Sequence, residues 1–250
     1  MPRSGTATLS WASKRGWRGP PRATRRGGAQ TRPGGGVGLR RVCDGPRGQH
    51  QDPLEQLVTK LRPGDLVTHT FHGLTDGILD DAGKVNDAIL DAQRRSVVFD
   101  VGHGAGSFSF RVAEKAFARG FFPGNVSGDL HRYNADGPVF DQVTTLSKFL
   151  HMGMPLPEVV RLSTAATAKT MGIAERLGTL KAGAVGDATV LRMDEGGFSL
   201  ADAMKVSVEA RKRLTHVRTV RSGRIYRPLG QVTISGEPLS PDIVTCPRGR

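Results

Sequence analysis

Histidine and aspartate residues recur at the ends of three short apolar segments in the central part of the sequence. His69 ends the segment DLVTH and is followed closely by His72, His103 follows SVVFDVG, and Asp129 follows NVSG with His131 two residues later. Imidazole and carboxylate groups are ligands of catalytic Zn²⁺, which keeps one coordination position open for water. A single histidine of this kind is more often structural, but three consecutive segments that end this way favour a metal-dependent hydrolase.

The three apolar segments alternate with helical patterns, which is typical of parallel βα folds. The carboxyl ends of the strands carry the chemistry in such folds, so we expect the polar residues at one edge of a parallel sheet. Strands are predicted at 65–71, 96–102 and 125–131, and helices at 53–62, 84–95, 108–120, 141–153 and 155–172.

Composition divides the chain into four parts. Residues 53–177 carry the βα pattern, and residues 178–230 show short β segments separated by turns, which predict a small β domain. Residues 231–250 are rich in Pro, Gly and Ser and are expected to form a loose tail. Residues 1–52 are dominated by Arg, Gly and Pro without an apolar period, so we expect them to be disordered.

The net charge of +13 is concentrated at the start of the chain. The first 50 residues hold ten Arg and one Lys against one acidic residue, whereas the other 200 hold 25 basic and 22 acidic residues. The basic segment is either a nucleic-acid-binding arm or the product of a wrong start or a frameshift. We favour the second interpretation and do not expect nucleic acid as a partner.

Two cysteines give no disulfide framework, and no apolar run approaches the roughly 18 residues of a membrane span. The N-terminus also lacks the apolar segment of about 7–15 residues that a secretory signal needs. We therefore expect a cytoplasmic protein without a membrane partner.

Four stretches resemble, in the same order, the amidohydrolase/deacetylase group of the amidohydrolase superfamily, which is related to dihydroorotases and D-aminoacylases. The stretches are RPGDLVTHTFHG, FDVGHGAGSFSF, SGDLH followed by GPVFD, and GTLKAGAVGDATV. The second stretch is particular to this group, and the last is common to much of the superfamily. The resemblance runs from about Pro53 to about Pro228.

The resemblance implies an α/β fold, a (β/α)₈ TIM-type barrel with a small β-sandwich made from both chain ends. This chain would hold the last three βα units and part of the sandwich, an incomplete barrel. The strand that carries His69 would then expose an unpaired edge.

The resemblance also implies roles for single residues. His69 matches a metal ligand, and Asp129 matches both a metal ligand and the catalytic acid and base. His103 fits a role in binding substrate or in contacting the metal ligands without binding the metal itself. His72 and His131 are weaker candidates for the same roles. The implied cofactor is Zn²⁺, as one or two divalent ions, and the implied partner is a small N-acylated or O-acylated substrate. Ring opening, as in dihydroorotase, stays open as an alternative reaction.

The chain departs from the family pattern in two ways. The His-x-His pair, the carboxylated lysine and the histidine of the first five strands have no counterpart, and Gly128 replaces a threonine, which is expected to loosen that strand end. Three hypotheses follow, namely an active metal-dependent amidohydrolase, a catalytically inactive fragment of one, and an Arg-rich nucleic-acid-binding protein.

Overall fold

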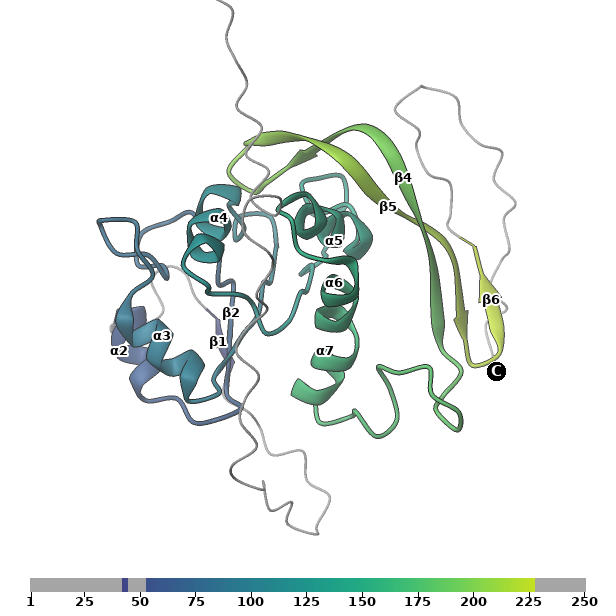
Figure 1. Ribbon diagram of the computed structural model, residues 1–250, viewed down its shortest axis with the longest axis horizontal. Helices are drawn as coiled ribbons and strands as arrows, with labels where there is room; N and C mark the ends of the chain where they lie inside the picture. The colour runs from purple at the N-terminus through teal and green to yellow at the C-terminus, as the bar shows by residue number, and fades with distance from the viewer. Residues whose placement is uncertain (1–41, 45–52, 228–250) are drawn as a thin grey trace, which may run out of the picture.

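The computed structural model describes residues 42–44 and 53–227, and it contains one parallel and one antiparallel sheet. The parallel sheet has the order β1 (Val42–Asp44), β2 (Leu66–Thr68), β3 (Val98–Phe99). Its strands alternate with helices along the chain, as Figure 1 shows. The α/β class predicted from the sequence is therefore confirmed.

Strand β1 corrects two expectations for the beginning of the chain. Val42–Asp44 lies within the segment expected to lack regular structure, yet it pairs in parallel with Leu66–Thr68. The edge of β2 that was expected to be unpaired is thus covered along its length. The physical reason is that an exposed strand edge presents backbone N–H and C=O groups that any neighbouring extended segment can pair with. The rest of residues 1–52 and the predicted tail at 231–250 lie outside the described residues.

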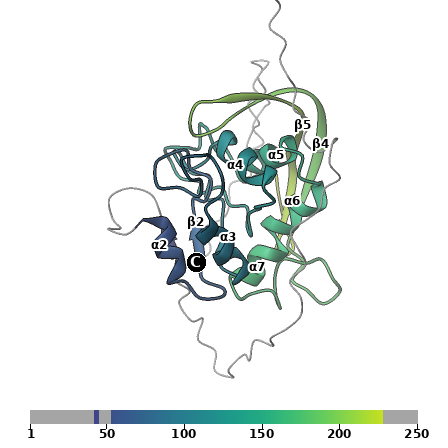
Figure 2. The same ribbon diagram turned by 60° about the vertical axis from the view of Figure 1, so that its left-hand side comes forward.

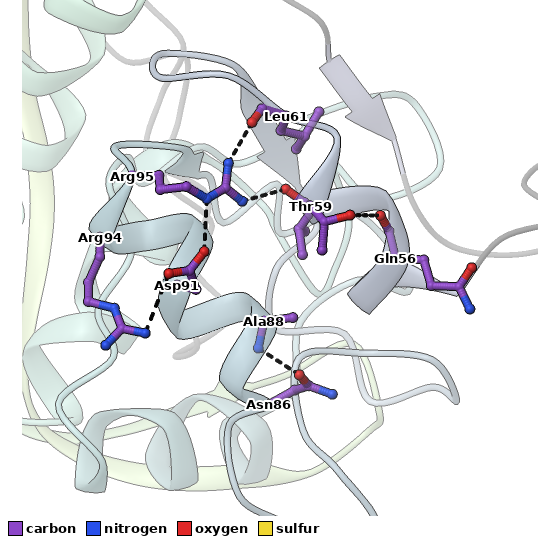
Figure 3. A network of polar contacts seen from close by, with 9 residues as sticks. Gln56, Thr59, Leu61, Asn86, Ala88, Asp91, Arg94 and Arg95 are labelled. Carbon is purple, nitrogen blue, oxygen red and sulfur yellow. Dashed lines mark hydrogen bonds and ion pairs between the residues drawn. The ribbon is translucent and has the colours of Figure 1, made fainter.

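Helices α2 (Leu54–Thr59) and α3 (Asp87–Arg94) are joined by the guanidinium group of Arg95, as Figure 3 shows. Arg95 Nη2 donates to the carbonyl oxygen of Val58 at 2.8 Å, and Nη1 donates to that of Leu61 at 2.7 Å. These carbonyls lie at and just beyond the C-terminus of α2, where a positive charge is favourable. Arg95 Nε also donates to the carboxylate of Asp91, in α3, at 2.9 Å. One guanidinium group therefore contacts both helices.

Phenylalanines fill the core between the parallel sheet and α4 (Phe110–Ala118). Phe71, three residues after the end of β2, makes edge-on contacts with Phe108, Phe117 and Phe121, with ring centroids 6.0–6.5 Å apart. Edge-on aromatic pairs contribute about 0.5–1.5 kcal/mol each beyond the burial of their area. The core therefore lies directly beneath the strand ends predicted to carry the chemistry.

Three further helices follow, α5 (Gln142–His151), α6 (Leu156–Ser163) and α7 (Ala165–Thr170). Helix α5 begins at Asp141, whose side chain accepts a hydrogen bond from the backbone N–H of Thr144 at 2.6 Å, a standard N-cap. Ser147 of α5 accepts a bond from the backbone N–H of Leu214 at 2.9 Å, so the helix is attached to the second sheet. The rotated view in Figure 2 keeps α5 and α6 next to this sheet.

The antiparallel sheet consists of β4 (Ala188–Ala201), β5 (Ser207–Arg221) and β6 (Arg224–Tyr226). Two long strands replace the short β segments that the sequence predicted. The Gly196-Gly197 pair, a sequence typical of turns, lies within β4 at the point where the register with β5 shifts. Such bulges bend a strand without ending it, and the β4–β5 ribbon arches over α4 and α5 (Figure 1).

Asp202 attaches the turn between β4 and β5 to the N-terminus of α4. Its carboxylate accepts a hydrogen bond from the backbone N–H of Phe110 at 3.0 Å and from those of Met204 and Val206 at 2.8 and 2.9 Å. Asp202 thus caps the N-terminus of α4, whose own N-cap residue, Ser109, makes no such bond. Within the part of the chain that the structure describes, no helix is long and apolar enough to cross a membrane.

Candidate active site at the strand ends

The three predicted strand ends meet at one edge of the parallel sheet. The predicted strand at 125–131 is reduced to an isolated parallel bridge between Asp100 and Asn125. Its backbone nevertheless continues beside β3, since the N–H groups of His103 and Gly104 donate to the carbonyls of Ser127 and Gly128 at 3.1 Å each. The sequence segments that end at His69, His103 and Asp129 are therefore neighbours in space.

His69 sits at a sharp bend immediately after β2. Its φ of 59° is in the left-handed region, which non-glycine residues adopt rarely. Its Nδ1 atom lies 2.6 Å from the carbonyl oxygen of Gly102. Because a carbonyl only accepts, Nδ1 carries a proton, and Nε2 is the ring nitrogen through which His69 could bind a metal. A histidine held in this way by its other ring nitrogen has the arrangement usual for a metal ligand.

Gly102 makes this arrangement possible. Its φ is 48°, and a Cβ atom there would lie 2.7 Å from His69 Nδ1 and would overlap the hydroxyl of Thr68. Two residues later, Gly104 has a φ of 52°, and a Cβ there would lie 2.8 Å from the Oδ2 atom of Asp129. The turn at residues 102–104 therefore packs against both candidate ligands, and a side chain at Gly102 or Gly104 would displace a neighbouring group of one of them.

Asp129 is exposed and has a φ of 47°, so both residues that the resemblance marks as ligands adopt left-handed backbone. Its backbone carbonyl accepts a hydrogen bond at 2.9 Å from the side chain of Asn134, which is fully buried. The neighbouring Gly128 was expected to loosen this strand end. In the structure the space beside it is taken by Gln142, whose side-chain oxygen would lie 2.9 Å from an added Cβ.

Asp100 is a buried carboxylate that sequence reasoning missed. Its Oδ2 atom accepts hydrogen bonds from the hydroxyls of Thr68 at 2.9 Å and Ser127 at 2.6 Å. The three residues come from three adjacent extended segments, so this network fixes their spacing. Burial raises the pKa of Asp100, and the two hydroxyl bonds oppose that shift. Its position in FDVGHG, at a predicted strand end, was the signal in the sequence.

Lys148 of α5 is a second buried group that the sequence did not reveal. Its side chain is fully buried, and Nζ lies 2.7 Å from His103 Nε2 and 2.8 Å from the carbonyl oxygen of Pro138. Burial lowers the pKa of Lys148 to about 7, opposed by the charges of Asp202 and Asp141. Burial and the charge of Lys148 lower the pKa of His103 to about 3, so this imidazole is neutral at physiological pH.

The remaining candidate histidines differ in their surroundings. His103 is buried with both ring nitrogens bonded within the protein, which favours a supporting role over direct contact with substrate. His72 is buried, and burial followed by the charge of His69 lowers its pKa. His131 is exposed beside Tyr133, with its Nδ1 atom accepting from the backbone N–H of Tyr133 at 3.2 Å.

The donor set of the described residues fits a divalent metal in kind but does not complete a site. His69 and Asp129 are ligands of the type that zinc uses, whereas a catalytic zinc normally takes three protein ligands. Among residues 53–227, no three His, Cys, Asp or Glu side chains lie together in a way that could hold a metal ion.

Comparison with known sequences gives a family match for the C-terminal part of the described residues and finds similar deacetylases. Residues 145–227 match the family model described as "Amidohydrolase family". A deacetylase of Enterococcus faecalis is 34% identical over 175 residues, and a deacetylase of Agrobacterium fabrum is 36% identical over 150 residues. These matches cover 69% and 60% of this chain. The chain spans 47% and 36% of the length of these two relatives.

Solved structures give the same result for the fold. An adenine deaminase superposes with a TM-score of 0.69 at 33% identity, over 72% of this chain and 50% of that protein. A dihydroorotase superposes with a TM-score of 0.63 at 28% identity, over 74% of this chain and 48% of that protein. Sequence motifs, relatives and solved structures agree that the chain belongs to the amidohydrolase superfamily.

Proposed function

We propose that the chain forms part of the active site of a metal-dependent amidohydrolase of the deacetylase group, with His69 and Asp129 as two of the metal ligands. One observation carries the proposal: both residues stand at strand ends on one edge of the parallel sheet, on either side of the strand end at His103, both adopt left-handed backbone, and both pack against the turn at 102–104. Left-handed backbone at non-glycine residues costs on the order of 1–3 kcal/mol and is concentrated at functional sites.

The architecture proposed for the whole site is an incomplete (β/α)₈ barrel. In it, β1, β2, β3 and the extended segment at 125–128 are consecutive barrel strands, since they run parallel and lie side by side. The β4–β5–β6 sheet is the corresponding portion of the small β-sandwich. Zn²⁺ is the proposed metal because imidazole and carboxylate are among its usual ligands.

Within this site Asp129 is the proposed acid and base. Its exposed carboxylate can accept the proton of an attacking water and return it to the departing amine. The proposed substrates are small N-acylated or O-acylated compounds, in keeping with the names of the curated relatives. A polar carboxylate at an open strand end suits cleavage of an amide or ester bond in a substrate that arrives from solvent.

A second candidate, favoured by the donor set, is that the chain does not hydrolyse amides by itself. The two donors found among residues 53–227 are one short of the three that a catalytic zinc normally takes. Both candidates use His69 and Asp129, and they differ only in whether the 250-residue chain completes the site.

A chimaera tests the residue roles. Residues 53–227 would replace the matching segment of the Enterococcus faecalis deacetylase, and acetate release from N-acetyl amino acids would be measured together with bound zinc. We expect Asp129→Asn to keep the fold, because Asn tolerates left-handed backbone, and to lower turnover about 10²–10⁴-fold. His69→Asn, chosen for the same backbone reason, should lower zinc occupancy.

Asp136→Asn is the matched control, since this exposed aspartate lies seven residues from Asp129 and has no proposed role in the site. It should leave both turnover and zinc occupancy unchanged. Undiminished turnover of the Asp129→Asn chimaera would show that the assignment of Asp129 is wrong.

A further inference from the structure

Lys148 connects two loops that the proposed reaction does not otherwise link. One of its hydrogen bonds goes to His103, in the turn that follows β3, and the other goes to Pro138, in the segment that follows Asp129. The backbone of Lys148 is also held in place, because its neighbour on α5, Ser147, accepts a hydrogen bond from the backbone of Leu214 in β5. A fully buried lysine usually needs partners that compensate for its lost hydration.

The contacts of His103 determine where its ring proton lies. Nδ1 is 2.9 Å from the carbonyl oxygen of Gly104, which can only accept, so Nδ1 carries the proton. Nε2 must then accept, and Lys148 Nζ is the donor at 2.7 Å. The ring stacks on buried Phe108 with centroids 4.7 Å apart, so its plane is fixed as well.

The turn that His103 occupies contacts both candidate ligands. The carbonyl of Gly102 orients the imidazole of His69, and Gly104 packs against the carboxylate of Asp129. On the other side, Pro138 belongs to the segment 130–141, which Asn134 ties back to the backbone of Asp129. A shift of His103 or of Pro138 would therefore move a partner of one or both ligands.

We propose that Lys148 is a positioning residue for this edge: it holds His103 as the Nδ1–H tautomer and locks the turn 102–104 and the segment 130–141 in register with His69 and Asp129. This role rests on the proposed function, since the groups held in place are the proposed ligands. Lys148 touches neither the proposed substrate nor the proposed metal, because its side chain is fully buried.

The charged groups around Lys148 support a structural use of its amine. Asp202, from the β4–β5 turn, and Asp141, from the start of α5, both act on it electrostatically, and His103 faces it directly. Two hydrogen bonds to neutral acceptors use only two N–H groups, which both the charged and the neutral amine possess. The link can therefore persist on both sides of neutral pH.

The test uses the full 250-residue chain labelled with ¹⁵N-histidine and reads the ring nitrogens by long-range ¹H–¹⁵N NMR between pH 6 and pH 8. The wild-type His103 ring should show a proton on Nδ1 and an unprotonated, hydrogen-bonded acceptor at Nε2 at every pH in this range. A gradual shift of the Nε2 signal with pH would report the Lys148 amine, whose pKa is about 7. A proton on Nε2 at any of these pH values would overturn the proposal without any variant being needed.

Lys148→Met, compared with Lys169→Met on the exposed surface of α7, supplies the second arm. Loss of Lys148 should shift the His103 Nε2 signal, move the ring signals of His69, and speed amide exchange at Gly104 about tenfold, the effect of losing one hydrogen bond. Lys169→Met should change none of these. Unchanged His69 and Gly104 signals in folded Lys148→Met would refute the positioning role.

These readouts need neither metal nor turnover, so they separate this proposal from the proposed function. The predicted tautomer together with a chimaera in which His69 and Asp129 have no effect on zinc or turnover would refute only the function. The opposite pair of results would refute only the role of Lys148.

Discussion

Replacing Lys148 by Met should change how the stability of the chain depends on pH. The pKa of Lys148 falls from 10.5 to about 7 in the folded protein, chiefly through burial. Between these values the unfolded chain binds the lysine proton more strongly than the folded chain does. The free energy of unfolding should therefore rise with pH across this window in the wild type.

The expected magnitude follows from the two pKa values. For one group with a pKa of 10.5 unfolded and about 7 folded, the free energy of unfolding increases by about 2 kcal/mol between pH 7 and pH 9. Methionine keeps much of the length of the side chain but cannot titrate. The difference in unfolding free energy between wild type and Lys148→Met should therefore grow by about 2 kcal/mol over these two pH units.

The assay is urea denaturation followed by circular dichroism at both pH values, with Lys169→Met as the control. The control should follow the wild type at both pH values, because Lys169 is exposed. Lys148→Met also loses two hydrogen bonds, so the pH dependence, and not the absolute stability, carries the test. A wild-type to Lys148→Met difference that is the same at pH 7 and pH 9 would refute the assignment of a buried, readily deprotonated amine.

Two further substitutions test other parts of the site. Gly102→Ala should lower the free energy of unfolding by about 2–4 kcal/mol, since the added methyl group meets Thr68 and His69 and the backbone is left-handed. The control is Gly106→Ala, which has open space around it and should lower the free energy of unfolding by less than about 1 kcal/mol in the same urea denaturation experiment. Asp202→Ala removes the acceptor of three backbone N–H groups and should cost about 2–3 kcal/mol by thermal or urea unfolding. Equal effects of the two glycine variants, or a neutral Asp202→Ala, would contradict these accounts.

The strand-end histidines and Asp129 could be found from the sequence because local patterns place them. Apolar runs, helical spacing and the Pro63-Gly64 break define the βα units, and parallel strands bring their carboxyl ends to one edge. The predicted bounds of the strands were less accurate than their positions along the chain. The strand expected at 125–131 is only a bridge at Asn125, because the backbone bends at Asp129.

Lys148 and Asp202 could not be assigned from the sequence, because their roles depend on distant partners. Lys148 lies in a helical pattern where a lysine is usually solvated, and its partner His103 is 45 residues away. Asp202 caps a helix 92 residues earlier in the chain. Strand β1 was missed for a related reason, since a three-residue strand gives no period and forms through pairing with Leu66–Thr68.

We propose that His69 and Asp129 are two ligands of an amidohydrolase metal site that the described residues do not complete. The direct test is to dialyse the purified 250-residue chain against a weak chelator, measure zinc by elemental analysis, and measure acetate release from N-acetyl amino acids. We expect zinc far below one ion per chain and no acetate release, because a catalytic zinc normally takes three protein ligands and no third joins His69 and Asp129 among residues 53–227. Near-stoichiometric zinc that disappears in His69→Asn, together with measurable acetate release, would contradict the claim that the site is incomplete.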